Sequence, residues 1–84
     1  MDSSTRQENL EKIRQILDDL YGIDPGTTTE EASFTRDLGL SDVDMDELLS
    51  IHFEWAFDIK ISHLDHEKLT TVASVLDYVE NRKA

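Results

Sequence analysis

The sequence predicts an all-α fold: a bundle of three main helices and one short helix, with a long loop after the first helix. Three observations lead to this prediction. Apolar residues recur at helical spacing in three separate segments, the length of 84 residues fits one domain, and residues 59–61 have no second apolar run to pair with as a strand. We therefore expect residues 1–84 to form a single domain held together by helix packing.

The first helix is expected at about residues 5 to 20. Ser3, Ser4 and Thr5 are candidate N-caps, and the helix should stop near Tyr21 and Gly22. Its apolar face consists of residues at helical spacing: Leu10, Ile13, Ile16, Leu17 and Leu20.

A long loop is expected from the end of this helix to about Leu40. It contains the only proline, in the pair Pro25-Gly26, which breaks regular structure. Phe34, Leu38 and Leu40 are too apolar to be left in water, so the loop should lie across the bundle.

A second helix is expected from Asp42 to Phe57, with acidic residues crowding its first turn, where they suit the positive end of the helix dipole. Its apolar stripe is Met45, Leu48, Leu49, Phe53 and either Ala56 or Phe57.

The remaining chain is expected to hold the short helix and the last main helix. Residues 59–61 should form an extended link, and residues 63–68 one short helical turn. Thr70 or Thr71 then caps a final helix over about residues 72–81. Its inward residues are Val72, Val75, Leu76 and Val79.

The chain is strongly acidic, because nineteen acidic and eight basic side chains give it a formal charge of -11. Residues 30–58 hold nine of the acids and one base, Arg36. Such a field repels nucleic acid and anionic lipid, attracts basic protein surfaces and favours a monomer. The chain has no cysteine and no apolar run long enough to span a membrane, so we expect a cytoplasmic protein without disulfides.

Ser41 is the candidate modification site. The glycine-broken segment before it should expose its hydroxyl at the start of the acidic helix, where it could accept a phosphate ester. The alternative is that Ser41 is only an N-cap, since Asp44 follows three residues later.

Several short motifs, in their order and spacing, resemble the acyl carrier protein family over nearly the whole chain. They are Asp37-Leu38-Gly39, then Asp44 and Glu47-Leu48, then Phe57-Asp58-Ile59-Lys60-Ile61, and finally Lys68 to Val72 and Asp77 to Val79. The resemblance implies the four-helix fold of that family and a carrier, not an enzyme, that bears acyl groups as thioesters on a 4'-phosphopantetheine arm.

The resemblance also implies partners and site residues. The arm would be attached to Ser41 by a phosphopantetheinyl transferase. Acyl-transferring or synthase enzymes with basic patches would dock on the acids of the second helix and its surroundings. These docking residues are Asp37, Asp42, Asp44, Asp46, Glu47 and Glu54.

The attachment motif departs from the family's Gly-x-Asp-Ser-Leu, because this chain has Gly39-Leu40-Ser41-Asp42-Val43. An ungapped alignment from Gly39 places Asp42 at the serine position, whereas one counted back from Phe57 places Val43 there. The second-helix segment is one residue longer than the family's. The alternative function is therefore a carrier-like interaction module that docks partners without an arm.

The other groups of polar residues predict neither a catalytic site nor a metal site. Ser41 and His52 would lie about 16 Å apart along one helix and cannot form a catalytic pair. His63 and His66 lie beside Asp65 but lack a further ligand to complete a metal set, so no metal site is expected.

The acids at 42, 44 and 46 do not continue as a calcium loop, because neither the glycine nor the final glutamate is present. For Trp55, packing against the first or last main helix is the favoured interpretation, and an exposed docking anchor is the alternative.

Overall fold

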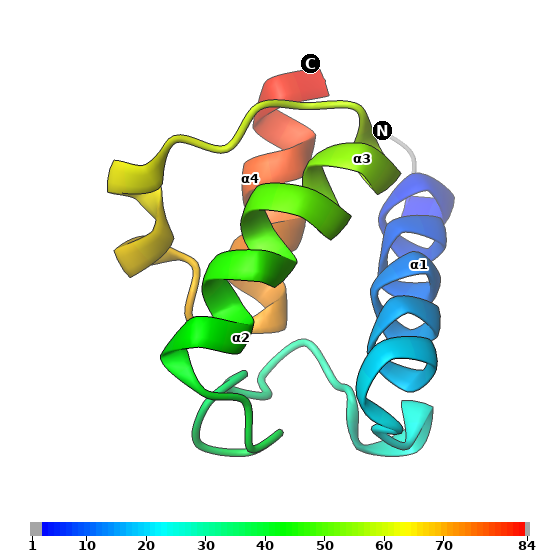
Figure 1. The fold of residues 1–84 in the computed structure, drawn as a ribbon. Helices are drawn as coiled ribbons and strands as arrows, with labels where there is room; N and C mark the ends of the chain where they lie inside the picture. Colours follow the sequence, from blue (N-terminus) through cyan, green and yellow to red (C-terminus); the bar gives the residue numbers. More distant parts are fainter. Residues whose placement is uncertain (1–2, 84) are drawn as a thin grey trace.

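The computed structural model describes the backbone of residues 3–83 and the side chains of residues 5–82. Its elements, in order, are α1 (Ser3–Tyr21), the 3-10 turn η1 (Pro25–Thr27), α2 (Asp42–Glu47), the π-helical segment η2 (Leu48–Phe53), α3 (Glu54–Phe57), the 3-10 helix η3 (His63–Lys68) and α4 (Val72–Lys83) (Figure 1). The all-α prediction is confirmed: within the described residues the only β feature is an isolated bridge between Ser33 and Thr71.

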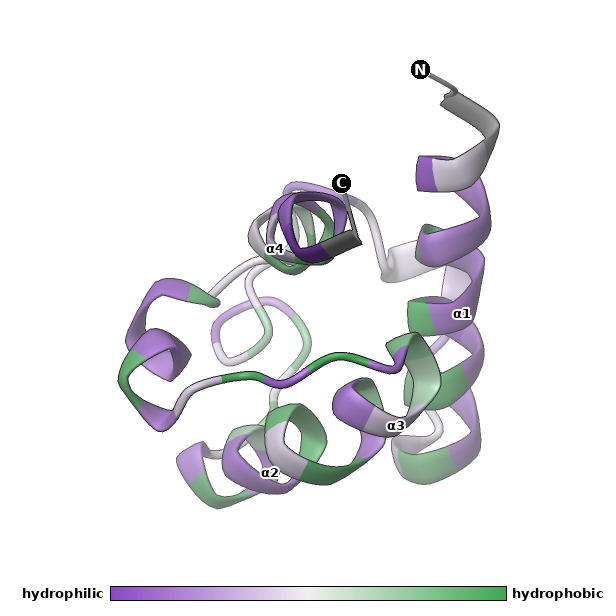
Figure 2. Cartoon of the chain, turned by 90° about the horizontal axis from the view of Figure 1, so that it is seen from above, coloured by the Kyte–Doolittle hydropathy of each residue, from purple (hydrophilic) through white to green (hydrophobic). Residues whose placement is uncertain are grey.

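The helices surround a common interior. In Figure 1 the rod formed by α2, η2 and α3 crosses in front of α4, with α1 on one side and η3 on the other. Figure 2, which looks down on the same arrangement, shows hydrophobic and hydrophilic residues interspersed along the helices. This amphipathic pattern is the reason that the helices pack around one core rather than standing apart.

The core is formed by residues from every main helix and from the loop. Three phenylalanine rings run through it, with centroids 6.2 Å apart for Phe34 and Phe53 and 6.0 Å apart for Phe53 and Phe57. The buried hydrophobic residues are Leu10, Ile13, Leu17, Ala32, Phe34, Leu40, Leu48, Leu49, Phe53, Phe57, Ile61, Leu69, Val72, Val75, Leu76 and Val79. The expected inward faces of all three main helices are thereby largely confirmed, with Leu20 exposed as an exception.

The long loop lies across the bundle, as the sequence predicted. Its backbone is tied to the start of α4 by hydrogen bonds from the Phe34 amide to the Thr70 carbonyl (3.0 Å), from Val72 to Ala32 (3.1 Å) and from Ala73 to Glu30 (2.8 Å). These bonds satisfy backbone groups that burial of the loop would otherwise leave unpaired.

An arginine fastens α1 to the same region. The Arg6 guanidinium contacts Glu30 of the loop at 2.8 Å, and Asp77 and Glu80 of α4 at 3.0 and 2.8 Å. The pKa of Arg6 is raised, most strongly by its hydrogen bonds to Glu30 and next by the one to Glu80, while burial lowers it by less.

The N-cap residues predicted from the sequence are confirmed for two helices and wrong for the first. Ser41 caps α2, and Thr71 caps α4 by accepting a hydrogen bond from the Ser74 amide at 3.2 Å. Ser3, Ser4 and Thr5, expected as caps of the first helix, lie within α1 instead. The described helix starts at Ser3, two residues before the expected start, and polar residues form its part before the apolar stripe that begins at Leu10.

The rod from Asp42 to Phe57 is one helix in outline, as predicted, but its middle is π-helical. It ends at Asp58, whose φ of 54° puts a non-glycine residue in the left-handed region. The packing expected for Trp55 is wrong, since 86% of this residue is exposed.

Candidate attachment site and docking surface

Ser41 is exposed at the N-terminus of α2, where it forms both halves of a capping box. The Asp44 amide donates to Ser41 Oγ at 3.1 Å, and the Ser41 amide donates to Asp44 Oδ2 at 3.1 Å. Among the described residues the Ser41 hydroxyl accepts this hydrogen bond and donates none. Its hydrogen is therefore free for replacement by another group.

The segment before Ser41 holds the serine at the rim of the bundle. Gly39 has a φ of 77°, a conformation that side chains disfavour, and it turns the chain toward α2. Leu40 is buried, and its amide donates to the Phe34 carbonyl at 3.0 Å. The turn at Gly39, followed by the buried Leu40, leaves Ser41 exposed to solvent.

The six acids predicted for docking are in different environments. Asp42, Asp46 and Glu47 are exposed on α2. Asp37 is exposed on the loop but accepts a hydrogen bond from the Ser33 amide at 2.7 Å.

The other two acids are more constrained. Asp44 belongs to the capping box, and Glu54 is partly buried and accepts from the Ile61 amide at 2.7 Å, so it holds the link after α3 in place. Asp46 is exposed as well but faces two histidines of η3, at 3.4 and 3.5 Å from its Oδ1. The least constrained acids of the predicted set are therefore Asp42 and Glu47.

Tyr21 lies beneath this acidic turn. Its hydroxyl donates to the Asp44 carbonyl at 3.5 Å. Burial, followed by the negative charges of Asp44 and Glu47, raises the pKa of Tyr21. The acidic field of α2 therefore reaches the end of α1.

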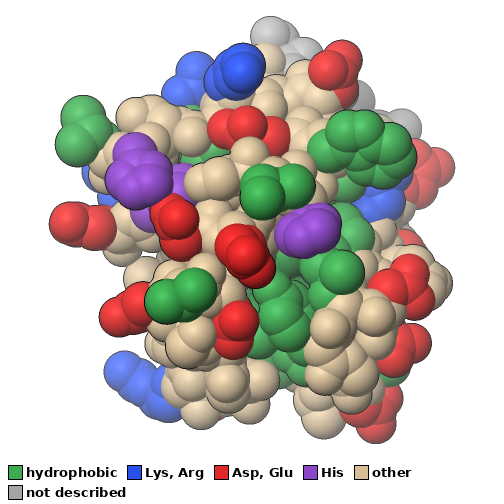
Figure 3. Space-filling model, viewed as in Figure 1, with side chains coloured by type: hydrophobic (Ala, Val, Ile, Leu, Met, Phe, Trp, Pro, Cys, Tyr) green, Lys and Arg blue, Asp and Glu red, His purple; other side chains and the backbone are tan. Residues whose placement is uncertain are grey.

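Apolar side chains stand among the acids on the outer face of the rod. Val43, Ile51 and Trp55 are 72%, 57% and 86% exposed, and Figure 3 shows hydrophobic and acidic side chains interspersed on this face. We call these three residues the apolar ridge. The sequence did not lead us to Val43 or Ile51, although Ile51 lies four residues before Trp55 and Val43 eight residues before Ile51, a spacing that favours one broad face of the helix.

A shallow groove of about 180 Å³ adjoins the ridge. The groove lies between α1 and the part of the rod formed by η2 and α3. Its lining residues are Ile16, Asp19, Leu20, His52, Trp55 and Ala56. An apolar groove beside acidic groups is suited to a partner side chain that has an apolar stem and a positive end, as in lysine and arginine.

Comparison with known proteins gives a consistent answer. No family model matches the chain. Among curated proteins, the chain is 33% identical over 79 residues to an acyl carrier protein of Thermotoga maritima. The matched region covers 94% of this chain and 96% of that protein. It is 42% identical over 74 residues to an acyl carrier protein of Rubrobacter xylanophilus, which covers 88% and 90%.

These relatives are compatible with the helical architecture. Acyl carrier proteins are carriers rather than enzymes, and they generally bear 4'-phosphopantetheine. No described helix combines the length and the apolar character that crossing a membrane requires. The helical bundle and two relatives matched over almost their full length lead to one conclusion: this chain belongs to the acyl carrier protein family.

Proposed function

We propose that this chain carries acyl groups as thioesters on a 4'-phosphopantetheine arm attached to Ser41, and that it docks partner enzymes through the acidic face of α2. The observation that supports this most is the exposed Ser41 hydroxyl at the rim of the acidic helix. The arm would supply the thiol that holds the acyl group. The protein would present the arm and provide the docking surface.

The surroundings of Ser41 fit such an arm. Esterification replaces the hydroxyl hydrogen, which the capping box does not use, and the oxygen remains in place facing the Asp44 amide. The positive end of the helix dipole favours the negative charge of a phosphodiester, whereas the carboxylates of Asp42 and Asp44 oppose it. The exposed position leaves room for a transferase to reach the oxygen.

Docking would use the acids of α2 together with the apolar ridge. The proposed partners are a phosphopantetheinyl transferase and acyl-transferring or synthase enzymes with basic patches. Individual exposed ion pairs contribute only about 0.2 to 1 kcal/mol, so the acidic field mainly accelerates association. An exposed tryptophan is a common source of affinity at protein interfaces, and Trp55 would supply it.

A second candidate, a carrier-like module without an arm, is supported by the π-helical segment. A π-helical turn holds more residues than an α-helical turn, so η2 is the natural place for the one residue by which this helix exceeds the family pattern. The register before η2 would then be counted from Gly39. In that register Asp42 occupies the family's serine position, and Ser41 the position of the preceding aspartate.

The mass of the intact protein separates the two candidates. The full chain is incubated with coenzyme A and a phosphopantetheinyl transferase of broad specificity, together with the variants Ser41→Asp and Asp42→Ser. Ser41→Asp removes the hydroxyl but keeps a residue that caps helices well. An added phosphopantetheine on the wild type that is absent from Ser41→Asp supports attachment at Ser41.

The opposite result is equally informative. If the wild type stays unmodified while Asp42→Ser gains the group, the transferase recognises the surface but cannot use the oxygen at position 41. That outcome rejects the arm on Ser41 and supports the module without an arm. Asp42→Ser is therefore the positive control for docking as well as the test of register.

A further inference from the structure

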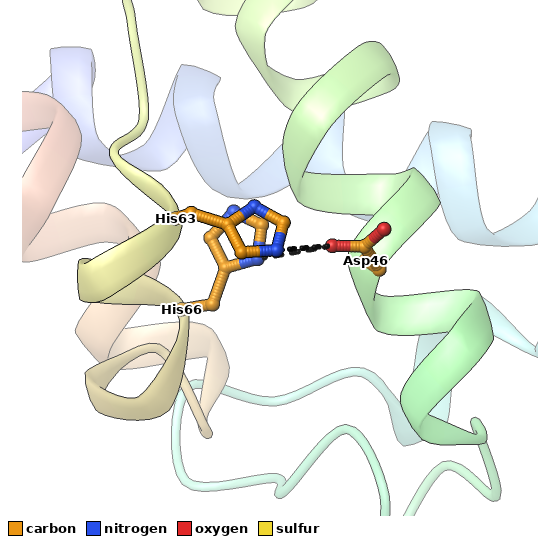
Figure 4. A group of neighbouring side chains, drawn as sticks. All are labelled: Asp46, His63 and His66. Atoms are coloured by element: carbon orange, nitrogen blue, oxygen red, sulfur yellow. Dashed lines mark ion pairs between the residues drawn. The ribbon is translucent and has the colours of Figure 1, made fainter.

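Two imidazoles and a carboxylate converge between η3 and α2. His63 Nε2 lies 3.4 Å and His66 Nδ1 lies 3.5 Å from the same atom, Asp46 Oδ1 (Figure 4). The centroids of the two rings lie 4.6 Å apart, with the ring planes tilted by 37°. The potential ligand atoms of the three residues all lie within 4.8 Å of one another.

Local geometry explains why these residues meet. A 3-10 helix has three residues per turn, so His63 and His66 of η3 project from the same side. Asp65, the acid next to them in sequence, points elsewhere: its Oδ2 accepts a hydrogen bond from the Tyr78 hydroxyl of α4 at 2.8 Å. The acid that faces the histidines is Asp46, contributed by α2 across the interface.

Two of the distances among these atoms match those between the ligands of a tetrahedral metal. Zinc binds imidazole nitrogen at about 2.0 to 2.1 Å and carboxylate oxygen at about 2.0 to 2.2 Å, which separates two ligand atoms by roughly 3.3 to 3.5 Å in a tetrahedron. The two distances to Asp46 Oδ1, 3.4 and 3.5 Å, fall in that range. Two nitrogens and one oxygen are also a ligand set that zinc accepts.

The two histidines differ in freedom. The His66 side chain is 14% exposed, and its Nε2 is buried without a hydrogen-bond partner among the described residues, so Nδ1 is the atom it offers to a ligand. The His63 side chain is 78% exposed and can adjust to close the site. With Asp46 at 53% exposure, solvent reaches a fourth position.

We propose that Asp46, His63 and His66 bind one Zn²⁺ ion, with water as the fourth ligand, and that this ion clips η3 to α2. Binding would remove the negative charge of Asp46 from the acidic face and limit the movement of η3. The inference is independent of the arm on Ser41, because it concerns neither that hydroxyl nor its modification.

The test uses the full chain, freed of metal and kept in excess Mg²⁺ so that weak carboxylate sites are filled. Titration with Zn²⁺ is followed by calorimetry, and Co²⁺ is used as a spectroscopic probe. We expect one ion per chain, the intense visible absorption of tetrahedral Co²⁺, and a higher unfolding temperature with Zn²⁺. Asp46→Asn and His63→Gln should each weaken Zn²⁺ binding by at least about tenfold.

Matched controls are Asp42→Asn, the same change one turn earlier on α2, and His52→Gln, which removes a histidine outside the cluster. Both should bind Zn²⁺ like the wild type. The proposal fails if Asp46→Asn or His63→Gln binds Zn²⁺ as tightly as the wild type, or if bound Co²⁺ shows only the weak spectrum of octahedral coordination. Asp46 and His63 are exposed, so neither variant should prevent folding.

Discussion

Replacing Arg6 with methionine tests how the three main parts of the fold are fastened. The guanidinium joins α1 to Glu30 of the loop and to Asp77 and Glu80 of α4. Methionine keeps the aliphatic bulk and removes the charge. The variant leaves three carboxylates near one another in a chain whose formal charge is already -11.

The expected loss follows from the exposure of each pair. The Arg6 side chain is 28% exposed and Glu30 is 36% exposed; this forked contact should contribute about 1 kcal/mol. Glu80, at 40%, should contribute about 0.5 kcal/mol, and Asp77, at 67%, close to nothing after solvent screening. With the added repulsion we expect a loss of about 2 kcal/mol, or a fall in Tm of roughly 8 to 16 °C.

The assay is urea unfolding at low salt, with Arg36→Met as the control. Arg36 is exposed and forms no ion pair among the described residues, and its replacement changes the net charge by the same amount. Arg6→Met should be less stable than Arg36→Met by most of the 2 kcal/mol estimated above. At about 1 M NaCl, where the Debye length is near 3 Å, the difference should shrink. Equal stability of the two variants at low salt would refute the reasoning.

Four further results are expected. Asp58→Gly should be more stable than Asp58→Ala by about 1 kcal/mol in urea unfolding, because only glycine relieves the φ of 54° while both remove the charge. In a Tyr78→Phe background, alkaline titration of phenolate absorbance should place the pKa of Tyr21 above 10, and Glu47→Gln should lower it. Because the folded pKa of Tyr21 exceeds the unfolded one, its contribution to stability is complete below about pH 10 and declines as the pH rises through the folded value. Trp55→Ala should change the free energy of unfolding by no more than about 0.5 kcal/mol, the range of a surface change, yet weaken binding to a basic partner by about tenfold or more. A large loss of stability would mean that the Trp55 side chain contributes to packing. Added NaCl should raise the Tm of the wild type, and a Tm independent of salt would show that the acidic charge is not self-repulsive.

Much of the fold was predictable because apolar periodicity identifies most of the face that each helix buries, although Leu20 at the end of α1 is exposed. The position of Trp55 was not predicted correctly, although the rod was. Phe53 and Phe57 already direct that face of the rod into the core, and residue 55 lies roughly 200° around the helix from each of them. Packing was the favoured interpretation for Trp55, whereas its angular position relative to Phe53 and Phe57 directs it away from the core.

The candidate sites were predictable to different degrees. The cap at Ser41 could be predicted from a serine followed by Asp44 three residues later. The capping box depends only on residues close in sequence, so it does not require knowledge of the tertiary packing. The cluster of Asp46, His63 and His66 depends on how η3 packs against α2, and the sequence alone drew attention to Asp65. The π-helical η2 is marked in the sequence only by an extra residue, because no side-chain type in it requires that hydrogen-bond pattern.

The hydrogen bonds between the long loop and the start of α4 also dictate when this chain can fold. Residues 30–34 are held by residues 70–73, so the loop cannot be fixed while the last helix is still being synthesised. A ribosome adds about 5 to 20 residues per second. The apolar faces of the first two main helices therefore stay exposed for seconds while the rest of the chain is synthesised. Stable folding should therefore begin only after α4 has left the ribosome, and it should then involve the loop and all the main helices together.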